Sequence, residues 1–367
     1  MTKLQELYER IGQSPWLDNL KRGWITSGDL ERWVERGVRG ITSNPTIFQK
    51  AISGAHDYDA QFGDLVGAGR SVEESYWELV RADIEDALRI LRPVHDTGGG
   101  DDGYVSVELA PDRARDTEGS IAAARLLHEQ IAEPNLFVKI PGTAEGVPAI
   151  GQMIAEGRSI NVTLLFSVER YGDVIDAYID GLSTFDANGG DLSRVASVAS
   201  FFVSRVDTET DRRLGEIGTP EALALRGKAA VANAKVAYEL FRERFAGPRW
   251  DGLAARGARV QRPLWASTST KNPAYPDTLY VDPLIGPDTV NTMPEQTLEA
   301  FEDHGVLAHT VSEGVVEAHH VLARLEEVGV DFADVTRTLE DEGVASFAKS
   351  FDELLTTLAD KADTLRG

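Results

Sequence analysis

The feature that most constrains the fold is a regular alternation of short apolar segments with longer amphipathic ones. The short segments have the length of β-strands, whereas the longer ones repeat their apolar residues every three or four positions, as helices do. Strand followed by helix is typical of βα units built around a parallel sheet. We count eight strand-like segments, at 16–19, 40–44, 104–109, 136–140, 160–165, 195–202, 263–267 and 279–284.

Several of these segments are apolar on both faces, as a sheet covered on both sides requires. Eight such strands predict an α/β fold with a single closed (β/α)8 barrel, the TIM barrel. That barrel typically needs about 250 residues, and the chain has 367. We therefore expect one domain over 1–367, enlarged by N-terminal helices, an insert at 207–262 between strands six and seven, and a helical C-terminal extension at 294–367.

Local signals place some of the helices. Ser71 and Glu74 form a capping box before an apolar stripe, and Pro93 is expected to stop that helix. The insert contains an Ala-rich helical section from Glu221 to about Phe245. A Gly/Asp segment at 97–103 has no strand-to-helix setting, so we interpret it as a surface turn and not as a phosphate-binding loop.

The composition of the chain argues against several classes of partner and cofactor. The formal net charge of −23 disfavours nucleic acid and anionic membranes, and no segment is apolar enough to span a membrane. Cysteine is absent, and the seven histidines lack metal-site spacing, so neither a thiol nor a metal is expected. Nucleotide-binding motifs are also missing, and we expect no cofactor. The N-terminus does not resemble a signal peptide, which predicts a cytoplasmic protein.

Lys139 is the most informative single residue, because it lies among the apolar residues of Leu-Phe-Val-Lys-Ile-Pro. It could extend its ammonium group to solvent from a strand end. Alternatively, burial disfavours the charged form and leaves a free amine, which can attack a ketone and form a Schiff base.

Two carboxylates at other strand ends could manage the protons of such a reaction. Asp18 follows the first strand-like segment and Glu108 ends the third. The alternatives are a helix cap or turn for Asp18, and for Glu108 an ion pair with Arg113 or Arg115.

Further polar residues lie at the strand ends. Asn44 precedes Pro45 and could be a turn residue without a ligand. Asn161 and Thr163 alternate with Val162, so they face the same side of the sheet, either the barrel interior or the helix layer. Buried polar groups need partners, which would be each other or a substrate rich in hydroxyls.

Several motifs together resemble those of transaldolases, in the longer bacterial form related to the mycobacterial type. Gly-Ile-Thr-Ser-Asn-Pro-Thr-Ile-Phe resembles one signature of that family, and Leu-Phe-Val-Lys-Ile-Pro-Gly-Thr with Gly-Arg-Ser-Ile-Asn-Val-Thr-Leu-Leu-Phe-Ser resembles another. Trp-Leu-Asp, Val-Glu-Leu and Ser-Phe-Phe-Val-Ser-Arg extend the resemblance over about two thirds of the chain. It implies a transferase of the pentose phosphate pathway that moves a dihydroxyacetone unit between sugar phosphates without a cofactor.

The resemblance also implies a role for each matching residue. Lys139 is the Schiff-base lysine, Asp18 the acid/base at the donor hydroxyl, Glu108 the proton shuttle, and Thr163 the residue that holds the catalytic water. The donor hydroxyls would be bound by Thr42, Asn44 and Asn161. The phosphate would be held by Ser200, Arg205, Ser267 and Lys271.

Lys271 is a departure from the family pattern. The usual Ala-Ser-Phe-Arg is replaced by Ala-Ser-Thr-Ser-Thr-Lys at 266–271, and a lysine lacks the bidentate fork of arginine. Two rival functions are an aldolase that acts on fructose 6-phosphate and a catalytically silent barrel that binds sugar phosphates. The insert and the C-terminal extension are the expected contact surfaces if copies of the chain form a homo-oligomer.

Overall fold

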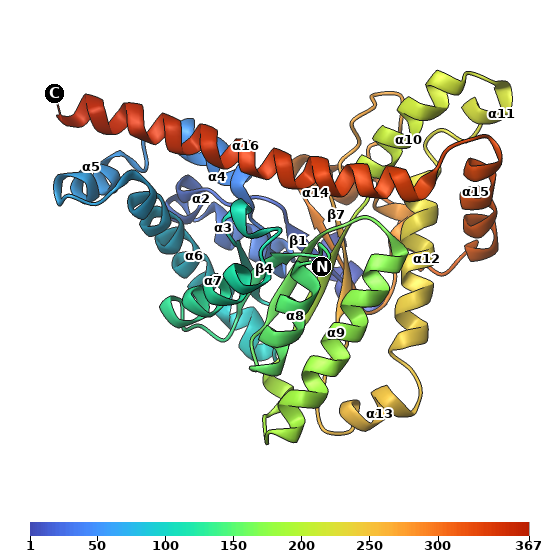
Figure 1. Ribbon diagram of the computed structural model, residues 1–367, viewed down its shortest axis with the longest axis horizontal. Coiled ribbons are helices and arrows are strands. Elements are labelled where there is room, and N and C mark those ends of the chain that lie inside the picture. Colours follow the sequence, from blue (N-terminus) through green and yellow to red (C-terminus); the bar gives the residue numbers. More distant parts are fainter. Residues whose placement is uncertain (367) are drawn as a thin grey trace.

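The centre of the molecule is a closed barrel of eight parallel strands (Figure 1). The computed structural model describes residues 1–366. Each strand is hydrogen-bonded to the next along the chain, and the last returns to the first, which confirms the predicted fold class. The strands are β1 (Gln13–Leu17), β2 (Gly40–Ile41), β3 (Tyr104–Glu108), β4 (Leu136–Pro141), β5 (Ile160–Leu165), β6 (Ser197–Phe202), β7 (Arg262–Ala266) and β8 (Thr289–Met293).

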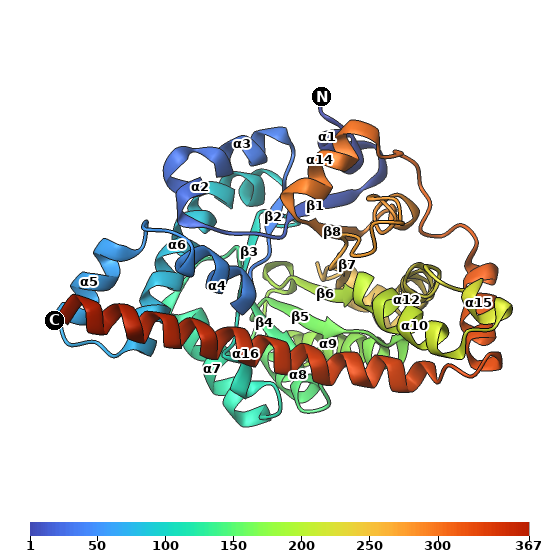
Figure 2. The ribbon, with the colours of Figure 1, turned by 90° about the horizontal axis from the view of Figure 1, so that it is seen from above.

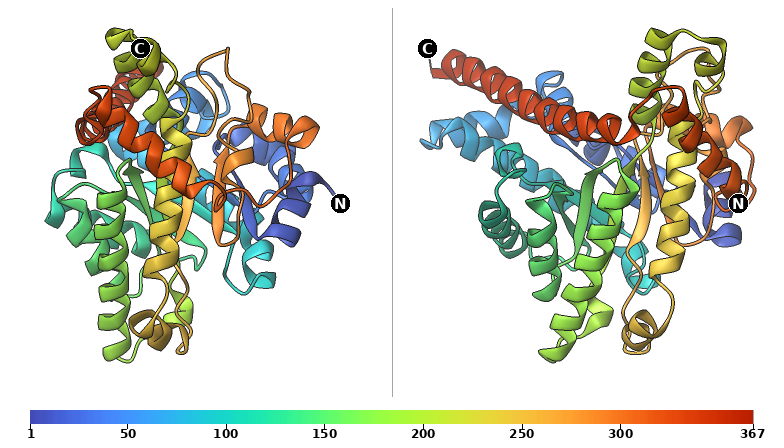
Figure 3. Two further views of the ribbon diagram at one scale, coloured as in Figure 1. Left: turned by 90° about the vertical axis from the view of Figure 1, so that its right-hand side faces the viewer. Right: turned by 45° about the vertical axis from the view of Figure 1, so that its right-hand side comes forward.

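Helices surround the barrel and also cover one of its ends (Figure 3). None of the helices in the described part is long and apolar enough to cross a membrane. The α-helices are α1 (Lys3–Glu6), α2 (Arg22–Ser27), α3 (Asp29–Arg36), α4 (Pro45–Ser53), α5 (Asp59–Gly67), α6 (Val72–Thr97), α7 (Thr117–Gln130), α8 (Gly146–Ala155), α9 (Val168–Ala187), α10 (Ser204–Ile217), α11 (Pro220–Leu223), α12 (Ala229–Arg244), α13 (Pro248–Ala254), α14 (Glu295–His304), α15 (Val315–Glu327) and α16 (Phe332–Arg366). Shorter turns are the π-helical η1 (Leu7–Ile11) and the 3-10 turns η2 (Pro111–Arg113), η3 (Leu192–Arg194) and η4 (Asp282–Leu284).

The eighth strand is not where the sequence predicted it. Segment 279–284 leads into the 3-10 turn η4, and β8 begins at Thr289. Pro283 occupies one of the first positions of this turn, where its fixed backbone angle favours a helical start and its missing amide donor is not needed. The true strand was overlooked because it carries polar side chains on both faces. Thr292 lines the barrel mouth, whereas Thr289 lies on the opposite face and accepts a hydrogen bond from Gln13 Nε2 at 2.9 Å.

Two helix boundaries also differ from the prediction. The capping box at Ser71 does begin α6, but the helix continues through Pro93 to Thr97. Pro93 is exposed, so water can bind the backbone carbonyl that loses its intrahelical partner. In the insert, the Ala-rich helix begins at Ala229 and not at Glu221, which belongs to the separate helix α11.

The Gly/Asp segment at 97–103 is only partly a surface turn. Asp102 is fully buried at the N-terminal end of the barrel. Its carboxylate accepts hydrogen bonds from Ser14 Oγ at 2.6 Å, Trp16 Nε1 at 3.0 Å, Arg39 Nε at 2.8 Å and Arg262 at 2.9 Å. Residues of β1, of the segment before β2 and of β7 therefore all bind one carboxylate. This cluster around Asp102 closes the N-terminal end of the barrel, which we call its floor.

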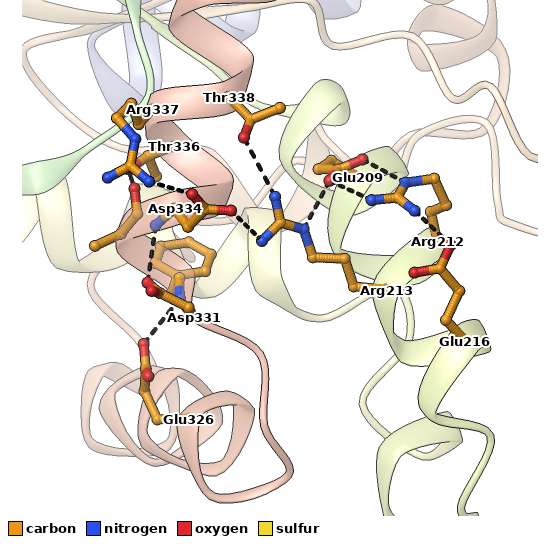
Figure 4. Close-up of polar contacts among 12 residues, drawn as sticks. Glu209, Arg212, Arg213, Glu216, Glu326, Asp331, Asp334, Thr336, Arg337 and Thr338 are labelled. Carbon is orange, nitrogen blue, oxygen red and sulfur yellow. Dashed lines mark hydrogen bonds and ion pairs between the residues drawn. The ribbon is translucent and has the colours of Figure 1, made fainter.

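Helix α16 crosses the opposite end of the barrel, where the strands end (Figures 1 and 2). It packs against α4 and α10, which follow β2 and β6. Figure 4 shows the polar network that fixes its beginning: Arg213 on α10 donates to Glu209 at 2.7 Å and to Asp334 on α16 at 2.7 Å. Farther along, Thr46 Oγ1 and Ser350 Oγ share a hydrogen bond of 2.8 Å. The helix is thus held over the barrel mouth at several points.

Candidate active site

A cavity of about 540 Å³ opens at the C-terminal ends of the strands, below α16. This is the end of a TIM barrel where active sites lie. Nine of the eleven residues singled out in the sequence line the cavity: Asp18, Thr42, Asn44, Lys139, Thr163, Ser200, Arg205, Ser267 and Lys271. The other two, Glu108 and Asn161, contact members of this set from the barrel interior.

Lys139 and Glu108 form a buried ion pair. They are direct register partners on β4 and β3, and Lys139 Nζ lies 3.0 Å from Glu108 Oε2. The ammonium also donates to the Ser43 carbonyl oxygen at 3.0 Å. Only 4% of Lys139 and 7% of Glu108 are exposed, so the solvent-exposed alternative for the lysine is wrong. Burial raises the pKa of the Glu108 carboxyl, and the charge of Lys139 opposes this rise.

The alternative partners of Glu108 bind elsewhere. Arg113 pairs with Asp112 at 3.2 Å, and Arg115 pairs with Glu340 on α16 at 2.9 Å. The charge of Glu108 is therefore directed at the lysine, and it does not belong to the surface ion pairs of η2.

Asp18 lies directly after β1 and is oriented by a chain of hydroxyl groups. Thr42 Oγ1 donates to Asp18 Oδ1 at 2.8 Å, and Thr42 and Thr292 Oγ1 are 2.6 Å apart. Because Thr42 gives its one proton to Asp18, Thr292 must be the donor to Thr42. The predicted alternative of a helix cap is wrong, since Lys21 is the residue that precedes α2. Burial raises the pKa of Asp18, while the Thr42 hydrogen bond and nearby cations oppose the rise.

Asn161 and Thr163 both face the barrel interior, one of the two sides left open by the sequence. Asn161 donates to Ser106 Oγ at 3.0 Å and accepts from Ser200 Oγ at 2.7 Å. Thr163 is fully buried, and within the described residues its Oγ1 has no hydrogen-bond partner. Such a hydroxyl at the cavity wall can bind a water molecule or a substrate oxygen.

Two residues next to the cavity have backbone angles that side chains rarely adopt. Leu164 follows Thr163 with φ of +57°, at an irregularity in the pairing of β5 with β6, and Ser267 has φ of +56° at the end of β7. Positive φ in non-glycine residues concentrates at functional sites, where the surroundings hold the strain in place. Both positions mark strand ends that contribute to the cavity.

Asn44 is the cap of a helix, whereas its Asn-Pro context suggested a turn residue. Its Oδ1 accepts from the Ile47 amide at 3.0 Å, which caps α4, while Pro45 occupies the first helical position. The same side chain lines the cavity. The cap therefore fixes Asn44 at the mouth, and a structural role does not exclude contact with a ligand.

The phosphate-binding residues proposed from sequence lie on the β6 and β7 side of the cavity. Arg205 is the second residue of α10, and its Cζ lies over the rings of Phe202 and Phe347, at 5.3 and 6.0 Å from their centroids. In residues 1–366 it makes no hydrogen bond or ion pair to protein. Burial lowers its pKa, opposed by Asp18, Glu108 and Glu342. Ser267 shares a hydrogen bond of 2.9 Å with Ser204 Oγ.

Some cavity residues were missed in the sequence. Thr292 was overlooked because β8 was misplaced. Ser346 and Phe347 belong to α16, whose apolar face was predicted but whose path was not. Lys50 could have been found, since helical spacing after the Asn44 cap places it on the same face as Ile47.

Comparison with known proteins shows which family has a similar sequence. The family model described as Transaldolase/Fructose-6-phosphate aldolase matches residues 15–358. A protein named Transaldolase from Parafrankia sp. (strain EAN1pec) is 54% identical over 352 residues, covering 95% of each chain. A protein of the same name from Acidothermus cellulolyticus is 53% identical, over 94% of this chain and 92% of its own. Another, from Thermobifida fusca, is 51% identical, over 97% of each chain. This chain therefore belongs to the transaldolase/fructose-6-phosphate aldolase family.

Proposed function

We propose that the protein is a transaldolase, which transfers a dihydroxyacetone unit from a ketose phosphate to an aldose phosphate. The observation that carries the proposal is the buried amine of Lys139, 3.0 Å from Glu108 at the barrel mouth, in a chain 54% identical to a protein named Transaldolase. The donors would be sedoheptulose 7-phosphate or fructose 6-phosphate, and the acceptors glyceraldehyde 3-phosphate or erythrose 4-phosphate, all of the pentose phosphate pathway.

The first step joins the donor to the enzyme. Glu108 accepts the proton that the Lys139 ammonium must lose, and the free amine attacks the C2 ketone of the donor. Glu108 then returns a proton to the carbinolamine oxygen, which leaves as water. The unpaired hydroxyl of Thr163 is suited to hold that water beside the reacting carbon.

The second step breaks the bond between C3 and C4 of the donor. Asp18 removes the proton of the C4 hydroxyl, an aldehyde forms at C4, and the electron pair of the broken bond moves into the iminium group to give an enamine. The aldose phosphate leaves. The enamine then attacks the aldehyde carbon of a second aldose phosphate, Asp18 returns the proton, and hydrolysis releases the new ketose phosphate. The lysine nitrogen is the electron sink, so the reaction balances without a cofactor.

The rival activity within the same family is the aldolase reaction, in which a proton and water end the cycle instead of a second sugar. The relatives named Transaldolase favour transfer. The two reactions differ in one measurable respect: a transaldolase sustains turnover of fructose 6-phosphate only when an acceptor aldose phosphate is present, whereas an aldolase needs none.

The central experiment is borohydride reduction after mixing with fructose 6-phosphate, read by peptide mass spectrometry. We expect a reduced dihydroxyacetone adduct on Lys139, which disappears in Lys139→Met. The matched control is Lys349→Met, at an exposed lysine of α16, which should label as the parent does. An adduct that persists in Lys139→Met would remove the central residue of the mechanism.

A further inference from the structure

One wall of the cavity is formed by a single face of α4. Thr46, Ile47, Lys50 and Ala51 line the cavity, a spacing of three and four residues that places them on one side of a helix. The Asn44 cap fixes the beginning of α4, and the hydrogen bond between Thr46 and Ser350 of α16 fixes its side. Figure 2 shows α4 and α16 next to each other over the strand ends. The position of this wall is thus well defined.

Lys50 has no partner on the protein. In residues 1–366 its side chain makes neither an ion pair nor a hydrogen bond, although the chain carries 60 acidic residues. Lys21, another lysine of the cavity, is paired with Glu295 at 3.5 Å. The ammonium group of Lys50 is therefore the one cationic group of α4 that remains available at the cavity.

Other cations face the same space. Burial lowers the pKa of Lys271, and the nearby charges of Arg205 and Lys50 lower it further, with Asp18 acting in the opposite direction. The carboxylates at the cavity are already engaged, Asp18 by Thr42 and Glu295 by Asn19 and Lys21. Arg205, Lys271 and Lys50 thus lack a directly bonded carboxylate partner, and a bound anion would further relieve the repulsion that Arg205 and Lys50 exert on Lys271.

We propose that Lys50 is a phosphate-binding residue that determines specificity, and that it completes a site with Arg205 and Lys271 for the phosphate of both donor and acceptor. This inference rests on the proposed function. A phosphate dianion presents three terminal oxygens, and these cations approach it from α10, the segment after β7, and α4. Lys271 is a point charge where a guanidinium fork would donate two parallel hydrogen bonds. Lys50 supplies a further charge-assisted donor from the opposite wall.

The test compares phosphorylated with unphosphorylated acceptors. At saturating fructose 6-phosphate, Lys50→Met should raise KM for glyceraldehyde 3-phosphate about tenfold or more, as expected for a lost charge-assisted hydrogen bond, with little change in kcat. KM for glyceraldehyde, which has no phosphate, should stay the same. The inhibition constant of inorganic phosphate should rise in parallel, Lys50→Arg should retain most of the affinity, and Lys349→Met should behave as the parent.

Three outcomes would overturn the assignment. The first is an equal rise of KM for glyceraldehyde 3-phosphate and for glyceraldehyde, and the second is a change in Lys50→Met no larger than that in Lys349→Met. The third is an effect of Lys50→Met that disappears in 0.5 M salt, because a direct contact survives screening better than long-range attraction does. Failure of the proposed function is distinguishable, because the parent would then give no borohydride adduct. In that case calorimetric titration with inorganic phosphate tests Lys50 alone: equal affinity in the parent and Lys50→Met refutes the assignment.

Discussion

Asp18 illustrates how a single residue is prepared for proton transfer. The hydroxyls of Thr292 and Thr42 fix its orientation, and burial raises its pKa. A raised pKa makes a carboxylate a stronger base, which suits the removal of a proton from a sugar hydroxyl. In the proposed mechanism the neighbouring pair of Lys139 and Glu108 serves the other step, so we expect the two functions to be separable by mutation.

We predict that Asp18→Asn lowers kcat by about 10²–10⁴-fold, the usual contribution of a positioned general base, while Lys139 still captures the donor. Asparagine keeps an oxygen that can accept from Thr42 but cannot take the proton. Mass spectrometry after borohydride reduction should find the intact six-carbon sugar phosphate on the variant and mainly the three-carbon unit on the parent. If the variant accumulates the three-carbon adduct as fast as the parent, another group is the base.

Asp207 on α10 predicts a pH dependence of stability. Its oxygens accept from the Ala230 amide at 2.8 Å and the Tyr280 hydroxyl at 2.9 Å, and burial raises its pKa to about 6. The folded state therefore holds this proton more tightly than the unfolded state, whose value is near 3.8. The stabilising contribution is complete below about pH 4 and is lost as the pH rises through about 6.

Relative to Asp207→Asn, the free energy of unfolding of the parent should fall by roughly 2 kcal/mol between pH 4 and pH 7, since each pKa unit corresponds to about 1.4 kcal/mol and the unfolded state is still partly protonated at pH 4. Urea denaturation at the two pH values measures this difference. The control is Asp251→Asn at an exposed position, which should follow the parent. Parallel pH profiles for the parent and Asp207→Asn would refute the prediction.

At the residue scale, candidate site residues could be predicted from the sequence where their immediate neighbours make them unusual. Lys139 was identifiable because it is a charge inside an apolar strand, and Glu108 because it ends one. Their ion pair could not be read from the sequence, because it depends on the register between β3 and β4. The same holds for Lys50, whose importance comes from charges on other walls of the cavity.

Among the elements, the floor of the barrel depends on Asp102. Burial tends to raise the pKa of this carboxyl, but Arg262 and Arg39 outweigh burial and hold it below its usual range. We predict that Asp102→Asn costs about 3–5 kcal/mol of folding free energy, because two poorly exposed arginines lose their counter-charge. Urea denaturation measures the loss.

The matched control for the floor is Asp101→Asn. Asp101 is the adjacent residue, but it is exposed and pairs with Arg259 at 3.2 Å, and exposed pairs contribute only about 0–1 kcal/mol. Because the floor lies at the end of the barrel opposite the cavity, kcat of the folded Asp102→Asn variant should match that of the parent. Equal stability of the two variants would mean that Asp102 does not hold the floor.

Helices and strands were predictable where the apolar pattern of the segment matches the burial of its side chains in the fold. The bounds of β5 match the predicted segment, because its apolar residues are concentrated in a short segment and include the β-branched Ile160 and Val162, which favour strands. β8 was misplaced because its buried side chains include Thr289 and Thr292, whose hydrogen bonds to Gln13 and Thr42 the pattern alone does not reveal. The amphipathic pattern of α16 indicated a buried face, but it carries no information about the direction in which the helix crosses the barrel.

For the whole molecule, we predict that residues 1–367 unfold as one domain. The core is continuous from β1 to α16, and α16 packs on helices from both halves of the chain. Calorimetry should give a single transition whose calorimetric and van't Hoff enthalpies agree. A separate transition for the insert or for the C-terminal extension would show that the chain has more than one cooperative unit.

The path of α16 has a consequence for biosynthesis. This helix of 35 residues, about 52 Å long at 1.5 Å per residue, follows all eight strands in the chain, yet it supplies Ser346 and Phe347 to the cavity wall. On the ribosome, the barrel can close while its mouth is still open. Arg205 gains one of its two flanking rings only when Phe347 arrives. Chains interrupted before this helix would thus contain Lys139 without the part of the cavity wall that α16 supplies. Under the proposed function, catalytic competence would be acquired only after α16 has been synthesised.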